Sequence, residues 1–203
     1  MSLLQPLTPP ERFDPSAELY RSAFEAALPW AEYLASANPA QLLRWQAAYD
    51  NSTLTEGHRV MLGGFTRRMP VLAMSGIWCG DCIREGALLQ RIAEAAPSVE
   101  LRFLDRDQTP RALREALHVL GAPRVPATLL LSEDFWFVDR LGDRSLATYR
   151  RMAFTQLGDS CPTGIGSPAE DELAAALVEL VERFERAHLQ LRVFPALRQR
   201  HGD

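Results

Sequence analysis

The sequence predicts an α/β fold in which a central mixed sheet is flanked by helices and preceded by a helical N-terminal extension. Apolar runs of strand length occur at residues 69–77, 99–104 and 127–131. The segments between and after these runs carry the 3.6-residue apolar spacing of amphipathic helices. The run at 69–77 is apolar throughout, which is typical of a strand buried on both faces of a sheet with helices on each side.

The chain before this strand is predicted to be helical after an irregular arm. Residues 1–15 hold four prolines and no apolar period. Helical spacing follows at residues 16–50, where we expect Pro29 and Pro39 to divide the segment into two or three short helices. A further helix is expected at 53–68. We assign residues 1–66 to an extension packed on the core.

The core is expected to alternate strands and helices in chain order. After the strand at 69–77 the pattern becomes helical, and a second strand, a short helix and two final strands follow. The last two strands are separated only by Ser132-Glu133-Asp134, so they are predicted to form an antiparallel hairpin. The expected ranges after the first strand are a helix at 82–96, a strand at 99–104, a helix at 110–120, and strands at 127–131 and 135–141.

The remaining chain is predicted to be helical up to a basic tail. A helix is expected at 145–157, then a loop at 158–167 that contains Cys161, and then a long amphipathic helix at 168–191 with acidic residues in its first turn. Residues 192–203 are basic and poorly patterned. We assign 67–191 to the α/β domain and 192–203 to a C-terminal tail.

Composition and charge exclude several classes of function. The net charge of −4 does not favour nucleic acid or an anionic membrane surface as a partner. No basic segment followed by an apolar segment opens the chain, and no apolar run approaches the ~20 residues that a membrane span needs. The 3 cysteines do not form the framework of a secreted disulfide-rich protein, so we expect a cytoplasmic setting.

The stretch whose residues indicate a chemical function is 71–82, which reads VLAMSGIWCGDC. A strand here delivers Cys79 and Cys82 to the first turn of a helix. Unpaired backbone N–H groups and the positive end of the helix dipole stabilise a thiolate at that place. Cys79 should therefore titrate below the roughly 8.5 of a free thiol and attack disulfides, while Cys82 closes the ring. The motif predicts a thiol–disulfide oxidoreductase.

A structural zinc site is the main alternative for the two cysteines. Such a site needs about four ligands. Cys161 is the remaining thiol, and the 4 histidines show no ligand spacing. We therefore favour redox chemistry and expect no metal. Cys161 is interpreted as a packing or loop thiol, with a third redox role as its alternative.

The order of elements and the residues Trp78-Cys79-Gly80-Asp81-Cys82 resemble the thioredoxin family, and in particular bacterial members with a WC-(Gly or Pro)-Asp-Cys motif. The pair Arg106-Asp107 after the second strand fits this branch. The resemblance implies that Val125–Pro126 is a cis peptide facing the cysteines and that the Val125 backbone pairs with the substrate chain. Trp78 would form a flat lid beside the nucleophile.

The resemblance also implies a reaction without a cofactor. Its partners would be a disulfide-containing substrate and a cellular dithiol that reduces the Cys79–Cys82 bridge.

Two residues depart from thioredoxin itself. Asp81 stands where thioredoxin has proline, and Ala73 stands where it has a buried acid. We expect the Asp81 carboxylate to be solvated and to raise the pKa of Cys79 by repulsion; a proton relay to Cys82 is the alternative. The missing acid leaves a second function open, a binding or adaptor protein with marginal redox activity.

Overall fold

The computed structural model describes residues 13–157 and 166–203. Most of the expected N-terminal arm therefore lies outside the described residues. So does most of the loop at 158–167, including Cys161.

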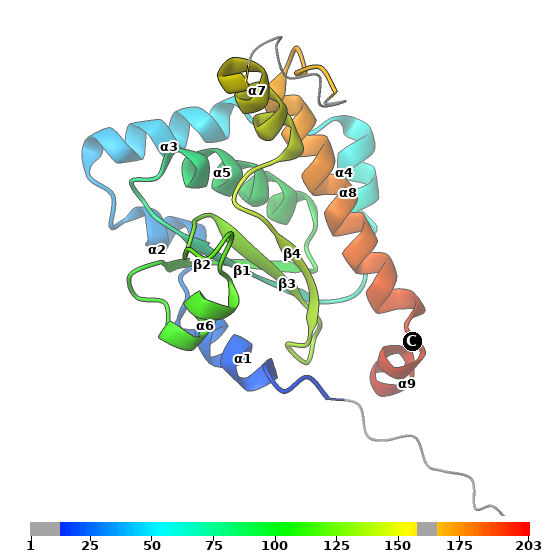
Figure 1. Cartoon of the computed structure of the whole chain (residues 1–203). Helices are drawn as coiled ribbons and strands as arrows, with labels where there is room; N and C mark the ends of the chain where they lie inside the picture. Colours follow the sequence, from blue (N-terminus) through cyan, green and yellow to red (C-terminus); the bar gives the residue numbers. More distant parts are fainter. Residues whose placement is uncertain (1–12, 158–165) are drawn as a thin grey trace, which may run out of the picture.

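A four-stranded sheet with the order β2-β1-β3-β4 forms the centre of the molecule (Figure 1). β1 runs parallel to β2 and antiparallel to β3, and β3 and β4 are antiparallel, which confirms the mixed sheet and the hairpin. The strands are β1 (Met69–Ser75), β2 (Val99–Asp105), β3 (Ala127–Leu131) and β4 (Phe137–Leu141). The fourth strand begins later than expected because Phe135 has a φ of 63° and belongs to the turn.

Every residue of β1 is buried, as its apolar run predicts. Val71 and Ala73 belong to one core cluster, and Leu72 and Met74 belong to a second, so alternate side chains enter opposite faces of the sheet. α3, α5 and α8 supply the first cluster, and α1 and α6 supply the second; Figure 1 shows these groups on opposite sides of the sheet.

The segment in which prolines were expected to divide the chain forms three helices, α1 (Ala17–Ala26), α2 (Trp30–Leu34) and α3 (Pro39–Asn51). Pro29 caps α2, and Pro39 occupies the first turn of α3, where a missing N–H costs nothing. Between α1 and α2, Leu28 exchanges backbone hydrogen bonds of 2.8 and 2.7 Å with Phe103 of β2. The N-terminal segment therefore pairs with the edge of the sheet.

The limits of the next helices differ from the expected ones, and each difference has a local cause. α4 (Glu56–Gly63) begins after Thr55, whose hydroxyl accepts from the His58 N–H at 3.2 Å, and it ends at Gly64. α5 (Gly80–Ala95) starts two residues earlier than expected because Cys79 caps it. α6 (Arg111–Ala116) stops well before residue 120, where Leu120 and Gly121 have positive φ.

The C-terminal part contains α7 (Leu146–Leu157), α8 (Glu172–Val193) and α9 (Pro195–His201). α8 begins after Asp171, whose carboxylate accepts from the Ala174 N–H at 2.9 Å. The expectation of a poorly patterned tail was wrong, because α9 lies within 192–203 and buries Leu197 in the first core cluster.

Candidate functional site

The two motif cysteines lie where β1 passes into α5. The chain leaves the buried strand at Ser75, turns through residues 76–78, and enters the helix at Gly80. Cys79 is the N-cap residue, and its sulfur accepts from the Cys82 N–H at 3.5 Å. This is the position at which unpaired helix N–H groups favour a negative charge.

The two thiols have opposite environments. Cys79 is half-buried, whereas Cys82 is only 1% exposed. The facing Cys82 thiol lowers the pKa of Cys79 from 9.0 to about 6, with help from backbone N–H groups and against the effect of burial. Burial and the neighbouring Cys79 raise the pKa of Cys82 far above its ordinary value. At neutral pH, Cys79 is therefore the more readily ionised thiol of the pair.

The segment before β3 lies against the exposed cysteine. The Val125–Pro126 peptide bond is cis. The Val125 carbonyl accepts from the Cys79 thiol at 3.7 Å, so both residues singled out in the sequence lie next to each other. The Val125 backbone is thus within reach of a chain bound at the Cys79 sulfur.

Trp78 lies on the surface before Cys79, and 48% of it is exposed. The Arg106 guanidinium lies over its ring at 5.0 Å from the centroid and also pairs with Asp107 at 3.0 Å. A Cβ at Gly76 would lie 3.0 Å from the Trp78 ring, so any larger residue there would push this ring away by a few tenths of an ångström. The Arg-Asp pair of the sequence thus holds the tryptophan.

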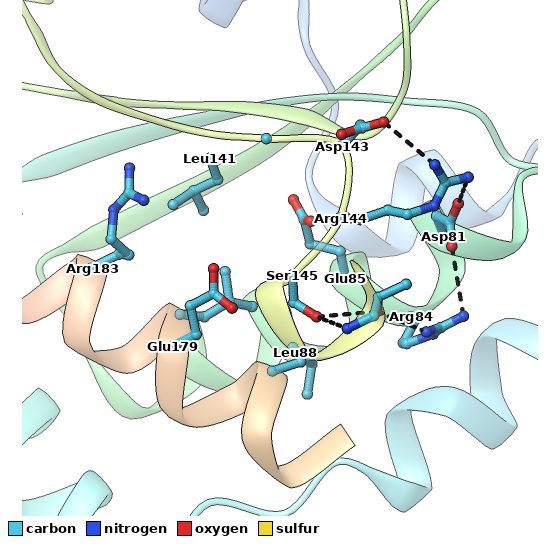
Figure 2. A pocket seen from close by; sticks show the side chains of 14 residues that line it. Asp81, Arg84, Glu85, Leu88, Leu141, Asp143, Arg144, Ser145, Glu179 and Arg183 are labelled. Atoms are coloured by element: carbon cyan, nitrogen blue, oxygen red, sulfur yellow. Dashed lines mark hydrogen bonds and ion pairs between the residues drawn. The ribbon is translucent and has the colours of Figure 1, made fainter. Parts of the chain in front are cut away.

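Asp81 departs from the expectation of a solvated carboxylate. Its carboxylate forms an ion pair at 2.7 Å with Arg144, from the loop before α7, and one at 3.6 Å with Arg84 on its own helix. Figure 2 shows Asp81 between these two guanidinium groups. The negative charge of Asp81 still raises the pKa of Cys79, but it is outweighed by the groups that lower it.

A polar pocket beside Asp81 contains a carboxyl group that the sequence pattern did not reveal (Figure 2). Glu85 lines this pocket and accepts from the Thr128 hydroxyl at 3.2 Å. Burial raises its pKa, as do the carboxylates of Glu179, Asp143 and Asp81, and the pKa reaches about 8 from 4.5 although the Thr128 hydrogen bond lowers it. Because Glu85 falls among apolar residues on α5, its polarity on a core-facing helix is the signal that could have drawn attention to it.

The N-terminal extension contributes directly to the motif. The buried Trp45 of α3 donates its indole N–H to the Ile77 carbonyl at 2.9 Å, in the turn before Cys79. Arg44, the neighbour of Trp45, reaches Gly80, where a Cβ would lie 3.5 Å from the arginine Nη2.

Over residues 13–157 and 166–203, no three His, Cys, Asp or Glu side chains are arranged to hold a metal ion. Within the same ranges, no helix is both long and apolar enough to cross a membrane.

The sheet order, the cysteines at the start of α5 and the neighbouring cis proline define a protein of the thioredoxin-like class. The thioredoxin family model matches residues 27–153, more than half of the chain, so the chain belongs to this family. The match begins inside the segment assigned to the extension. No match was found among curated proteins.

Two solved structures share the fold. A crystal structure of a protein of unknown function from Pseudomonas aeruginosa is 20% identical with a TM-score of 0.65, and the alignment covers 83% of this chain and 98% of that one. A crystal structure of an HIV epitope-scaffold is 18% identical with a TM-score of 0.57, covering 91% and 98%. At these identities the likeness concerns the fold alone.

Proposed function

We propose that this protein is a thiol–disulfide oxidoreductase that uses Cys79 and Cys82. The Cys79 thiolate attacks one sulfur of a substrate disulfide, and the other substrate sulfur leaves as a thiolate. Cys82 then attacks the Cys79 sulfur of the mixed disulfide, and the bound substrate sulfur leaves and takes up the proton that Cys82 loses. The substrate has gained two electrons and one proton from the protein, its first thiolate takes a proton from solvent, and the protein holds a Cys79–Cys82 disulfide.

The observation that supports this proposal best is the contrast between the two thiols. Cys79 is half-buried at the helix start with its pKa lowered to about 6, and Cys82 is buried with its pKa raised. A half-exposed thiolate in front of a protonated thiol suits attack first and resolution second. Membership of the thioredoxin family agrees with this chemistry.

The other residues around Cys79 have roles that follow from their positions. Trp78 and Gly80 flank Cys79, and the Val125 backbone beside Pro126 would pair with the substrate chain in the manner of a strand. A cellular dithiol would reduce the bridge again, and a reducing cytoplasm would supply it. No cofactor is needed for these steps.

Trapping tests the proposal. The Cys82→Ser variant should stall as a mixed disulfide with its substrate at Cys79, because the resolving thiol is missing. Trapped species should be released by dithiothreitol and absent from a Cys79→Ser, Cys82→Ser control. Finding no trapped disulfide, together with a wild-type dithiol that does not reduce disulfides, would refute the activity.

The adaptor alternative rests on Ala73, which places a buried methyl group where thioredoxin has an acid. An adaptor should bind its partner equally well in the wild type and in Cys79→Ser. An oxidoreductase should capture its partner stably in Cys82→Ser and lose that capture when Cys79 is replaced as well.

A further inference from the structure

Two buried hydroxyl groups lie near Cys82 and have no assigned role. Ser75, the last residue of β1, is 1% exposed, and Tyr33, from α2, is 2% exposed. Neither hydroxyl forms a hydrogen bond with any residue in the described part of the chain. Because a buried polar group without a partner is unfavourable, both hydroxyls call for an explanation.

Ser75 occupies the position between the tyrosine and the cysteine. It directly precedes Gly76, whose N–H donates to the Cys82 sulfur at 3.3 Å. The Ser75 hydroxyl is close enough to Tyr33 and to Cys82 to lower the pKa of each, although neither contact has hydrogen-bond geometry in the thiol state. The Ser75 hydroxyl therefore lies near both groups, next to the N–H that already donates to the Cys82 sulfur.

The tyrosine ring is held firmly, so its hydroxyl has a fixed place. It stacks on Phe103 at 5.1 Å between centroids and meets Trp45 edge-on at 5.8 Å. Burial raises the pKa of Tyr33, and negative charge on Cys82, Asp105 and Cys79 raises it further. The phenol is accordingly protonated at neutral pH and available as a donor.

We propose that Ser75 and Tyr33 stabilise the Cys82 thiolate during resolution of the mixed disulfide, Ser75 donating to the sulfur and Tyr33 donating to Ser75. This inference rests on the proposed function. As the Cys82 proton departs, the two hydroxyls and the Gly76 N–H stabilise the new charge. The Cys82 sulfur then bonds to Cys79, and the leaving substrate thiolate takes up the proton.

Such stabilisation is needed because Cys82 is almost fully buried and Ala73 supplies no acid beside it. The charges that act on Cys82 and Tyr33 are negative, from Cys79 at the N-cap of α5 and from Asp105 at the end of β2. Cys79 carries no charge once it is in the mixed disulfide. The hydroxyls, as neutral donors, therefore determine how easily Cys82 ionises at that moment.

Stopped-flow reaction with 5,5′-dithiobis(2-nitrobenzoate) separates the two steps, in a Cys161→Ser background. The attack of Cys79 releases one coloured thiolate, and resolution by Cys82 releases the second. Tyr33→Phe and Ser75→Ala should leave the first phase unchanged and slow the second about tenfold at pH 7. A tenfold loss is what the removal of one hydrogen bond to a charged group would cause. The pH profile of the second phase should move to higher pH, and Ser75→Thr should restore it.

Matched controls are Ser52→Ala, a serine that is equally buried at 1% exposure, and Tyr20→Phe, a tyrosine of the second core cluster. Both should keep the wild-type second phase. An unchanged second phase in Tyr33→Phe and Ser75→Ala, or a parallel slowing of both phases, would overturn the inference. If the unsubstituted pair released no second thiolate, the proposed function itself would fail.

Discussion

Asp81 introduces a negative charge close to the nucleophile, and its removal should make Cys79 more acidic. Two charges about 6 Å apart repel by roughly 2–3 kcal/mol at an effective dielectric of about 20, and the paired Arg144 and Arg84 reduce this several-fold. In Asp81→Asn we therefore expect the pKa of Cys79 to fall below about 6, by about half a unit. The pH dependence of iodoacetamide alkylation at Cys79 measures this pKa in the variant and in the wild type.

Asp50→Asn, on the exposed face of α3, serves as the control and should leave the alkylation profile of Cys79 unchanged. If Asp81 instead relays a proton, the mixed disulfide will form at the normal rate in Asp81→Asn but resolve slowly. A Cys79 pKa that stays the same or rises would show that repulsion is not the main effect of this carboxylate.

Glu85 should make the stability of the protein depend on pH. Its folded-state pKa is raised from 4.5 to about 8, so the unfolded chain loses this proton first and stability falls as the pH rises from about 4.5 to 8. The difference corresponds to at most about 5 kcal/mol, and partial exposure reduces it to about 2 kcal/mol. Glu85→Gln keeps an acceptor for Thr128 and should be more stable than the wild type at pH 8.

Urea unfolding at pH 5 and pH 8 tests this expectation. The advantage of Glu85→Gln should nearly vanish at pH 5, whereas the exposed Glu25→Gln should follow the wild type at both values. An equal difference between Glu85→Gln and wild type at the two pH values would show that Glu85 titrates normally.

Single residues were predictable from the sequence where local chemistry determines their state. Cys79 and Cys82 follow from the spacing of the motif and from the helix start, both of which are local. The ion pair of Asp81 with Arg144 and the burial of Glu85 are not local, since their partners lie 63 and 43 residues away along the chain. The expectation that Asp81 is solvated was therefore wrong, because its ion-pair partner Arg144 could not be identified from local sequence.

At the scale of elements, α5 depends on a glycine to approach α3. A Cβ at Gly86 would lie 2.5 Å from Trp45 Cζ3 and 3.2 Å from Phe103 Cε1. Gly86→Ala gains up to about 1 kcal/mol of helix propensity but should lose about 1–3 kcal/mol through overpacking. We expect a lower urea midpoint and faster labelling of Cys82.

Gly63→Ala provides the contrasting case in the last turn of α4, where the new Cβ would lie 3.7 Å from the Ala95 carbonyl oxygen, an ordinary contact. This variant should be as stable as the wild type or slightly more stable. Equal midpoints for Gly86→Ala and Gly63→Ala would mean that Trp45 can move aside without cost.

The elements themselves were largely predictable because their limits are set locally. Pro29 and Pro39 mark helix starts, and the complete burial of β1 follows from its apolar run. The helix α9 was missed because its apolar signal is small, with Leu197 as its buried residue. Its place depends on packing against the first core cluster, which no local pattern reveals.

At the scale of the whole molecule, the core joins the N-terminal helices to the α/β part. The first core cluster unites residues before 66 with strand and helix residues after it, and Trp45 bonds to the turn that carries Cys79. The sequence predicted helices packed on a core but could not show that they complete it, because such contacts connect distant segments. The N-terminal members of the cluster are Tyr33, Leu34, Trp45, Leu54, Leu62 and Phe65.

The chain truncated to residues 67–203 should therefore not fold cooperatively. Removing one large core side chain costs about 2–5 kcal/mol, and the total stability of a domain is only about 5–15 kcal/mol, so losing six exceeds it. In urea, the full chain should show one transition that coincides for far-ultraviolet circular dichroism and for Cys82 labelling. The truncated chain should show no sharp transition and immediate labelling of Cys82.

Leu43→Ala, an exposed site on α3, controls for surface effects and should retain the midpoint of the full chain. A cooperative transition in 67–203 at a similar midpoint would show that the α/β part is independent of its N-terminal helices.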